Sequence, residues 1–157
     1  MVKLSVPRKN NLQVKTDLNA LAEVLSWFAQ LYEPQIPRAI WLRCELALAE
    51  GFTNAIRHAH KDKPQELPID LEVTISENKI EMRIWDQGAG FDLKQHLKNL
   101  PKPEENQTGG RRGLQLIQKT TDDFSYTRTA DNRNCLLMIK LYCSENGSIQ
   151  RKIADLS

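Results

Sequence analysis

Two polar side chains near residue 50 have the types and spacing to do chemistry. Glu50 and Asn54 lie four residues apart in "IWLRCELALAEGFTNAIRHAH", which predicts a helix from about Pro37 or Arg38 to His60. Four residues advance about 40° around a helix, so these side chains stack at the rim of its apolar face. An amide oxygen suits Mg²⁺, and a carboxylate can accept a proton from a hydroxyl. The alternative is that Glu50 only reaches into water.

The apolar face beside these two residues is predicted from helical spacing. His58 falls on the stripe of Glu50 and Asn54, and a polar cap on the helix end is favoured for it over catalysis. The residues expected on the apolar face are Leu42, Leu46, Ala49, Phe52 and Ile56.

A second candidate is Asp86, in the stretch "WDQGAGFD" after the alternating run "KIEMRI". A carboxylate at the end of a strand can accept a hydrogen bond from an exocyclic amine, such as that of adenine. Gly88 and Gly90 have no Cβ and can adopt positive φ, so a flat base or a phosphate can approach the backbone. A plain Asp-x-Gly turn is the alternative, and this stretch alone does not decide between them.

A third candidate is a cluster of glycines and arginines before a short helix predicted at residues 113–121. Backbone N–H groups at a helix N-terminus bind phosphate readily, and arginines add positive charge. A flexible loop followed by a helix start is the alternative. The P-loop pattern Gly-x4-Gly-Lys-Ser/Thr is absent from the sequence, which excludes a P-loop enzyme. The cluster consists of Gly109, Gly110, Arg111, Arg112 and Gly113, with the first helical turn expected at Leu114–Ile117.

The elements that must position these candidates follow from periodicity and turn residues. Asp17 is the predicted N-cap of a first helix. The order strand, helix, helix, hairpin, loop, helix, hairpin predicts an α+β fold. We expect a two-layer sandwich, with a mixed, mostly antiparallel sheet covered on one face by helices. The remaining expected elements are a helix at 18–33, strands at 11–16, 69–75, 79–85, 123–129 and 135–143, and a long irregular segment at 92–112.

The composition limits the class of protein. The chain has 157 residues, which predicts one domain at 1–143 and a polar tail at 144–157. The net charge of +2 is spread along the chain, so nucleic acid is not an expected partner. No apolar run suits a membrane helix or a signal peptide, so no membrane partner is expected. Cys44, Cys135 and Cys143 have no metal-type spacing and suit reduced thiols in a cytoplasmic protein.

The order and spacing of the three candidate sites resemble the GHKL ATPase superfamily. "EGFTNA" looks like its N-box, "DQGAGF" like its first glycine box and "GGRRGL" like its second. The short chain, with two helices before the first glycine box, is most similar to the bacterial anti-sigma factor serine/threonine kinases. The resemblance covers roughly residues 12–142.

This resemblance implies a Bergerat-type, histidine kinase-like ATP-binding fold and a serine kinase that uses ATP and Mg²⁺. Asn54 would coordinate Mg²⁺, Glu50 would be the general base, and Asp86 would bind the adenine amino group. Gly88 and Gly90 would shape the nucleotide pocket. The other nucleotide-binding residues implied are Gly109, Gly110, Arg111, Arg112, Gly113 and Leu114.

The same resemblance implies protein partners. A STAS-domain anti-anti-sigma protein would be phosphorylated on serine. A sigma factor, a serine phosphatase and a second copy of the chain are further partners that it suggests.

Two departures from the family pattern matter. Arg111 stands where a glycine is usual, and the last strand, "RNCLLMIKL", has no threonine. The altered glycine box favours the alternative function, a module that sequesters a partner without kinase activity, with nucleotide bound or without it. The missing threonine bears on a water-bridged contact to the base and thus on the affinity for ATP. Glu50 favours the enzyme, because binding alone needs no base.

Overall fold

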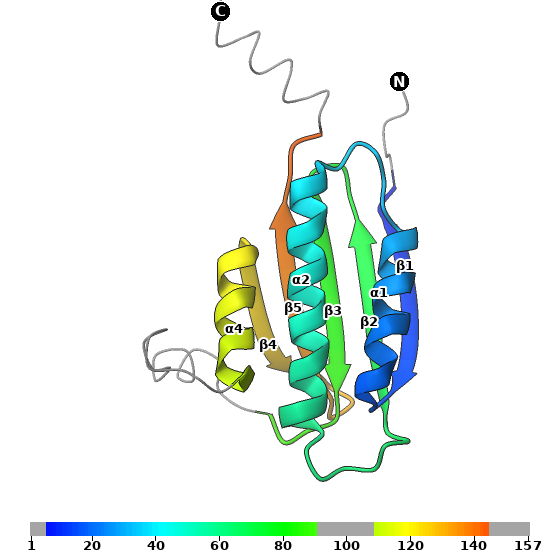
Figure 1. Cartoon of the computed structure of the whole chain (residues 1–157), viewed down its shortest axis with the longest axis vertical. Coiled ribbons are helices and arrows are strands. Elements are labelled where there is room, and N and C mark those ends of the chain that lie inside the picture. Colours follow the sequence, from blue (N-terminus) through cyan, green and yellow to red (C-terminus); the bar gives the residue numbers. More distant parts are fainter. Residues whose placement is uncertain (1–5, 91–108, 145–157) are drawn as a thin grey trace, which may run out of the picture.

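The computed structural model describes residues 6–90 and 109–144, and the side chains of 109–112 are outside this description. Helices lie on one face of a five-stranded sheet (Figure 1). The predicted order of elements is confirmed, while most of the segment at 92–112 and of the tail lies outside the described residues. The elements are β1 (Arg8–Lys15), η1 (Leu18–Ala20), α1 (Leu21–Gln30), α2 (Arg38–Asn54), η2 (Ala55–Ala59), β2 (Pro68–Ile75), β3 (Lys79–Asp86), α4 (Gly109–Thr120), β4 (Asp123–Arg128) and β5 (Asn134–Leu141).

The sheet has the strand order β1-β2-β3-β5-β4, and all four pairings are antiparallel. Side chains alternate along a strand, so β3 turns Ile80, Met82, Ile84 and Asp86 toward the helices, all of them buried. In Figure 1, α1 lies over β1 and β2, α2 over the middle of the sheet and α4 over β4. The expected α+β two-layer architecture is therefore confirmed. In the pairing of β3 with β5, Asp86 lies opposite Asn134.

The first helical segment starts as its sequence predicts. The Asp17 carboxylate accepts a hydrogen bond from the Asn19 N–H at 2.9 Å and caps the 3-10 turn η1, which leads into α1. Phe28 of α1 stacks on Trp41 of α2, with ring centroids 4.1 Å apart. This buried aromatic pair joins the two helices over the sheet.

The predicted apolar face of α2 is wrong. Leu42 and Leu46 are 48% and 40% exposed, and of the five expected residues only Phe52 is fully buried. The helix carries apolar residues nearly all the way round, so two different arcs fit the helical period. Gly51 determines which arc faces the sheet, because a Cβ at this position would lie 2.9 Å from the Ile84 side chain. The buried face consists of Trp41, Cys44, Ala47, Leu48, Gly51, Phe52 and Ala55.

Helix α4 begins at Gly109, four residues before its predicted start at Gly113. The cluster of glycines and arginines is therefore helical in its backbone, not a loop. Arginine has a high helix propensity, and the buried Leu114 and Ile117 fix one side of the helix in the core. These two effects outweigh the glycines, which lie mostly in the first turn.

The three cysteines are free thiols, and Cys44 and Cys135 are buried. Burial raises the pKa of Cys44 to about 12, so this thiol stays protonated at neutral pH. Within residues 6–90 and 109–144, no helix combines the length and apolarity needed to cross a membrane.

Candidate functional site

Asp86 is a buried carboxylate at the end of β3, only 3% exposed. Its Oδ1 accepts hydrogen bonds from the Gly88 N–H and from Asn134 Nδ2, both at 2.9 Å. Its Oδ2 accepts a hydrogen bond from the Tyr126 hydroxyl at 2.8 Å. These three donors offset the cost of burying a carboxylate. Both oxygens of Asp86 are therefore engaged by the protein itself.

Asn134 and Arg128 extend this network from β5 and β4. Asn134 Nδ2 also donates to the Gly88 carbonyl at 2.9 Å, and Arg128 Nη1 donates to the same carbonyl at 3.0 Å. Asn134 is not among the site residues predicted from the sequence, although the absence of a threonine from the same strand is predicted to affect the site. The signal was available, because Asn134 is in phase with the inward-facing Leu136 and Met138.

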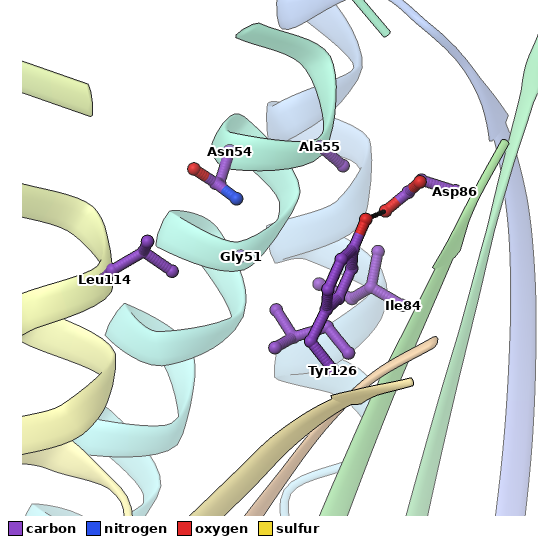
Figure 2. Close-up of a pocket in the computed structure, with 8 residues that line it drawn as sticks. Gly51, Asn54, Ala55, Ile84, Asp86, Leu114 and Tyr126 are labelled. Carbon is purple, nitrogen blue, oxygen red and sulfur yellow. Dashed lines mark hydrogen bonds between the residues drawn. The ribbon is translucent and has the colours of Figure 1, made fainter. Parts of the chain in front are cut away.

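Tyr126 is a further site residue that sequence analysis missed. Its ring extends from β4 into the space between α2 and β3, with the hydroxyl directed at Asp86 (Figure 2). Burial, together with the negative charge of Asp86, raises the pKa of Tyr126 well above its usual value, so the hydroxyl remains a donor. Alternation along β4 with Phe124, which packs against the core, was the signal that could have placed it.

The two glycines after Asp86 are required by contacts within the protein itself. A Cβ at Gly88 would lie 2.5 Å from the Ala59 carbonyl oxygen. Gly90 has a φ of 83°, and a Cβ there would lie 2.8 Å from Asn134 Oδ1. A turn at Gly90 and a close backbone approach at Gly88 therefore both require glycine here. The close approach is to Ala59, the last residue of η2, whereas the approach of a ligand to these glycines stays a prediction.

His60 holds the same turn from the other side. The segment after α2 is a π-helical turn, η2, closed by the His60 N–H donating to the Ala55 carbonyl at 2.8 Å. This turn directs the His60 ring inward, where Nε2 accepts the Gln87 N–H at 2.8 Å. Nδ1 then carries the proton and donates to Thr16 Oγ1 at 2.8 Å, because that hydroxyl donates to the Leu67 carbonyl. Burial lowers the pKa of His60, which favours this neutral form.

The wall opposite Asp86 is built from α2 and α4. Asn54 and Leu114 line the same cavity as Asp86. Glu50 Oε2 lies 2.8 Å from where a Cβ of Gly113 would be, so Glu50 packs against the first turns of α4. In the described part of the chain, the side chains of Glu50 and Asn54 make no hydrogen bond.

The fold thus brings most of the predicted residues to one place. Glu50, Asn54, Asp86, Gly113 and Leu114 surround the gap between α2, α4 and the end of β3. The backbone of residues 109–112 belongs to the adjoining first turn of α4, while their side chains lie outside the description. His58 is exposed and does not line this cavity, but it lines an open hollow beside Gly90.

The free space beside Asp86 is small. The cavity lined by Asn54, Asp86, Leu114 and Tyr126 has a volume of about 10 Å³, which is room for about one water molecule. A second, open hollow of about 300 Å³ is lined by Tyr126, Gly90 and Lys63, among others. The donor and acceptor groups suit a purine amine at Asp86, but a purine ring does not fit there while Tyr126 stays in place.

The sequence matches a known protein family and is similar to known kinases. The family model described as the histidine kinase-like ATPase domain matches residues 14–140. The serine-protein kinase RsbW of Listeria innocua is 32% identical over 84 residues, which are 50% of this chain and 53% of that protein. RsbW of Oceanobacillus iheyensis is 29% identical over 106 residues, 64% of this chain and 65% of that protein. The chain thus spans between half and two thirds of the length of these relatives.

A solved structure has a similar fold. The match is to a chain in the crystal structure of the SiaB–SiaC complex from Pseudomonas aeruginosa, with a TM-score of 0.54. It covers 84% of this chain and 89% of that chain at 13% sequence identity. At this identity the likeness concerns the fold alone.

Proposed function

Because this chain belongs to the histidine kinase-like ATPase domain family, we propose that it is an ATP- and Mg²⁺-dependent serine-protein kinase that acts as a regulatory switch of the anti-sigma factor type. The observation that carries the proposal is one shared site. Asn54 of α2 and Asp86 of β3 line one cavity, and Glu50 lies one helical turn from Asn54, against Gly113 of α4. The similarity to serine-protein kinases named RsbW supports the type of activity.

Each residue has a proposed role that its position supports. Asp86 would accept a hydrogen bond from the amine of the base, and the Asn54 oxygen would bind Mg²⁺. Within residues 6–90 and 109–144, no cluster of three or more His, Cys, Asp or Glu could bind a metal. Waters and phosphate oxygens would therefore complete the Mg²⁺ shell, as is usual for this ion.

Glu50 is the proposed general base. Its carboxylate would accept the proton of the substrate's serine hydroxyl. Bound ATP supplies the phosphoryl group, and positive charge and positioning matter more than covalent help in such transfers. The N-terminal turn of α4, from Gly109 to Gly113, together with Arg111 and Arg112, is proposed to bind phosphate through N–H groups and positive charge.

The proposed substrate is a serine of a small STAS-domain antagonist protein. A protein partner is also in keeping with the fold relative, whose structure is a complex of SiaB and SiaC. A sigma factor, a serine phosphatase and a second copy of this chain are the further partners we propose.

A module that binds its partner without turnover is the second candidate function. The observation that favours it is the Tyr126 hydroxyl bound to Asp86, with space for about one water beside it. Arg111, in place of the usual glycine of the second glycine box, points the same way.

Phosphoryl transfer from γ-labelled ATP to a STAS-domain protein of the same genome tests the proposal. We expect Glu50→Gln to lower the transfer rate by about 10²-fold or more, the range typical of a lost general base, while ATP binding is unchanged. Glu45→Gln, on the same helix, is the matched control and should transfer normally. Normal transfer by Glu50→Gln would refute the base role. ATP binding by the wild type without any transfer would refute the kinase and favour the binding module.

A further inference from the structure

The Tyr126 side chain occupies the space beside Asp86 in which a ligand of this carboxylate would bind. The Tyr126 hydroxyl donates to Asp86 Oδ2 at 2.8 Å, and its ring lies near Ile84 and Gly51, which line the same cavity (Figure 2). The other oxygen of Asp86 already accepts two hydrogen bonds, from Gly88 and Asn134. Oδ2 keeps one acceptor position, but the cavity beside it has room for about one water molecule, so a base amine reaches this oxygen only if the Tyr126 ring moves.

The two hollows of this region meet at Tyr126. The residue lines both the 10 Å³ cavity beside Asp86 and the open 300 Å³ hollow beside Gly90 and Lys63. The first is about the size of one water molecule, and the second is exposed to solvent. Since the same residue borders both spaces, we expect rotation of its ring away from Asp86 to join them into one pocket.

We propose that Tyr126 acts as a gate. Its side chain fills the site for the nucleotide base beside Asp86, and a nucleotide binds only when the ring leaves Asp86. This inference rests on the proposed nucleotide-binding function and adds the regulation of that site. The apparent affinity for nucleotide is then the intrinsic affinity multiplied by the fraction of molecules with the gate open. Any change that weakens the contact between Tyr126 and Asp86 raises this fraction.

Calorimetric titration of the full chain with ATP and Mg²⁺ tests the gate. Tyr126→Phe keeps the ring and removes one hydrogen bond of the closed state, so ATP should bind about three- to tenfold more tightly than to the wild type. Tyr126→Ala also empties the space of the ring and should tighten binding further. Tyr142→Phe is the matched control, because it removes a buried hydroxyl that donates to the Ser76 carbonyl, away from Asp86. The control should bind ATP as the wild type does.

Fluorine NMR gives a second measurement, in which the protein titrated with ATP carries no substitution and a variant serves only for assignment. The chain has 3 tyrosines, so labelling with 3-fluorotyrosine gives three resonances, and that of Tyr126 is assigned by its loss in Tyr126→Phe. We expect ATP to shift the Tyr126 resonance and to leave those of Tyr32 and Tyr142 in place. An unshifted Tyr126 resonance in the ATP-saturated protein would overturn the gate.

The variants also separate failure of the gate from failure of the kinase. If Tyr126→Phe and Tyr126→Ala bind ATP no more tightly than the wild type, or more weakly, the tyrosine is a wall of the site and the gate is refuted. This result leaves phosphoryl transfer by the wild type untouched. If both variants bind more tightly while no protein transfers phosphate, the gate stands and the kinase is refuted.

Discussion

The two walls of the site are built in opposite ways. On the sheet side, Asp86 accepts three hydrogen bonds, and its neighbour Gln87 is held by the buried His60. On the helix side, Glu50 and Asn54 are partly exposed, and within the described residues their side chains make no hydrogen bond. The polar groups of the sheet side are thus hydrogen-bonded in the folded protein, while those of the helix side stay available to a ligand.

This contrast predicts that the polar groups of the sheet side stabilise the fold, while those of the helix side serve the chemistry of the site. Buried polar groups on the sheet side must stay paired, because an unpaired one is costly. The helix side gains little from its polar groups in the absence of a ligand. Substitutions on the sheet side should therefore lower the free energy of unfolding of the ligand-free protein, and substitutions on the helix side should not.

The largest expected effect is that of Asp86→Ala. This change removes the acceptor of the Tyr126 hydroxyl and of the Gly88 N–H, and one of the two acceptors of the Asn134 amide. We expect unfolding to cost about 3–5 kcal/mol less. Urea unfolding without ligand measures the loss. The exposed Asp123 provides the control, since Asp123→Ala should cost far less. A loss below about 1 kcal/mol for Asp86→Ala would break the contrast between the walls.

Alanine at the two glycines, one on each wall, sharpens the same contrast. A Cβ at Gly88 meets the backbone oxygen of Ala59 at 2.5 Å, so Gly88→Ala should cost about 1–3 kcal/mol. A Cβ at Gly113 meets only the end of the flexible Glu50 side chain at 2.8 Å. Gly113→Ala should therefore be neutral, or stabilising by up to about 1 kcal/mol through helix propensity. Equal losses in the two variants, measured by thermal unfolding, would contradict this assignment.

A smaller effect is expected from pH, again on the sheet side. Burial lowers the pKa of His60 below its usual 6.5, and this outweighs the opposing charge of Asp86, while Lys63 acts in the same direction as burial. Below about pH 6.5 the unfolded chain binds a proton that the native His60 does not, so stability falls as the pH falls. Above that pH, the contribution of neutral His60 is fully present.

Urea midpoints at pH 5 and pH 7.5 measure this dependence. His60→Gln should reduce it relative to the wild type. Amide exchange at Gln87 should accelerate at the lower pH, relative to the intrinsic rate, because protonated His60 can no longer accept its N–H. A midpoint shift in His60→Gln equal to that of the wild type would show that His60 is not the titrating group.

The order of elements could be predicted because alternation and caps are local signals. The hairpin at 69–85 and the Asp17 cap are examples that the structure confirms. The buried face of α2 could not be predicted from period alone, since Leu42 and Leu46 form a second apolar arc that points outward. The predicted start of α4 was four residues too late. Glycines have a low helix propensity, but the buried Leu114 and Ile117 hold this helix against the core.

The site was predictable only as far as its local motifs reach. Glu50, Asn54 and Asp86 each belong to a short pattern, and the fold brings those patterns together. Tyr126 and Asn134 lie 40 and 48 residues from Asp86, so their contacts depend on the register of β3, β5 and β4. Nothing in a single stretch of sequence indicates that a tyrosine would occupy the space beside the carboxylate.

The π-helical turn after α2 has a consequence for insertions and deletions. A π turn contains one residue more than an α-helical turn, so η2 is equivalent to a one-residue insertion in an otherwise regular helix. Deletion of one residue between Ala55 and Ala59 would restore an uninterrupted α-helix, with no local penalty in its backbone hydrogen bonds. It would also rotate His60 away from Gln87 and Thr16. A length change that looks harmless in a helix would thus release the turn that presents Asp86.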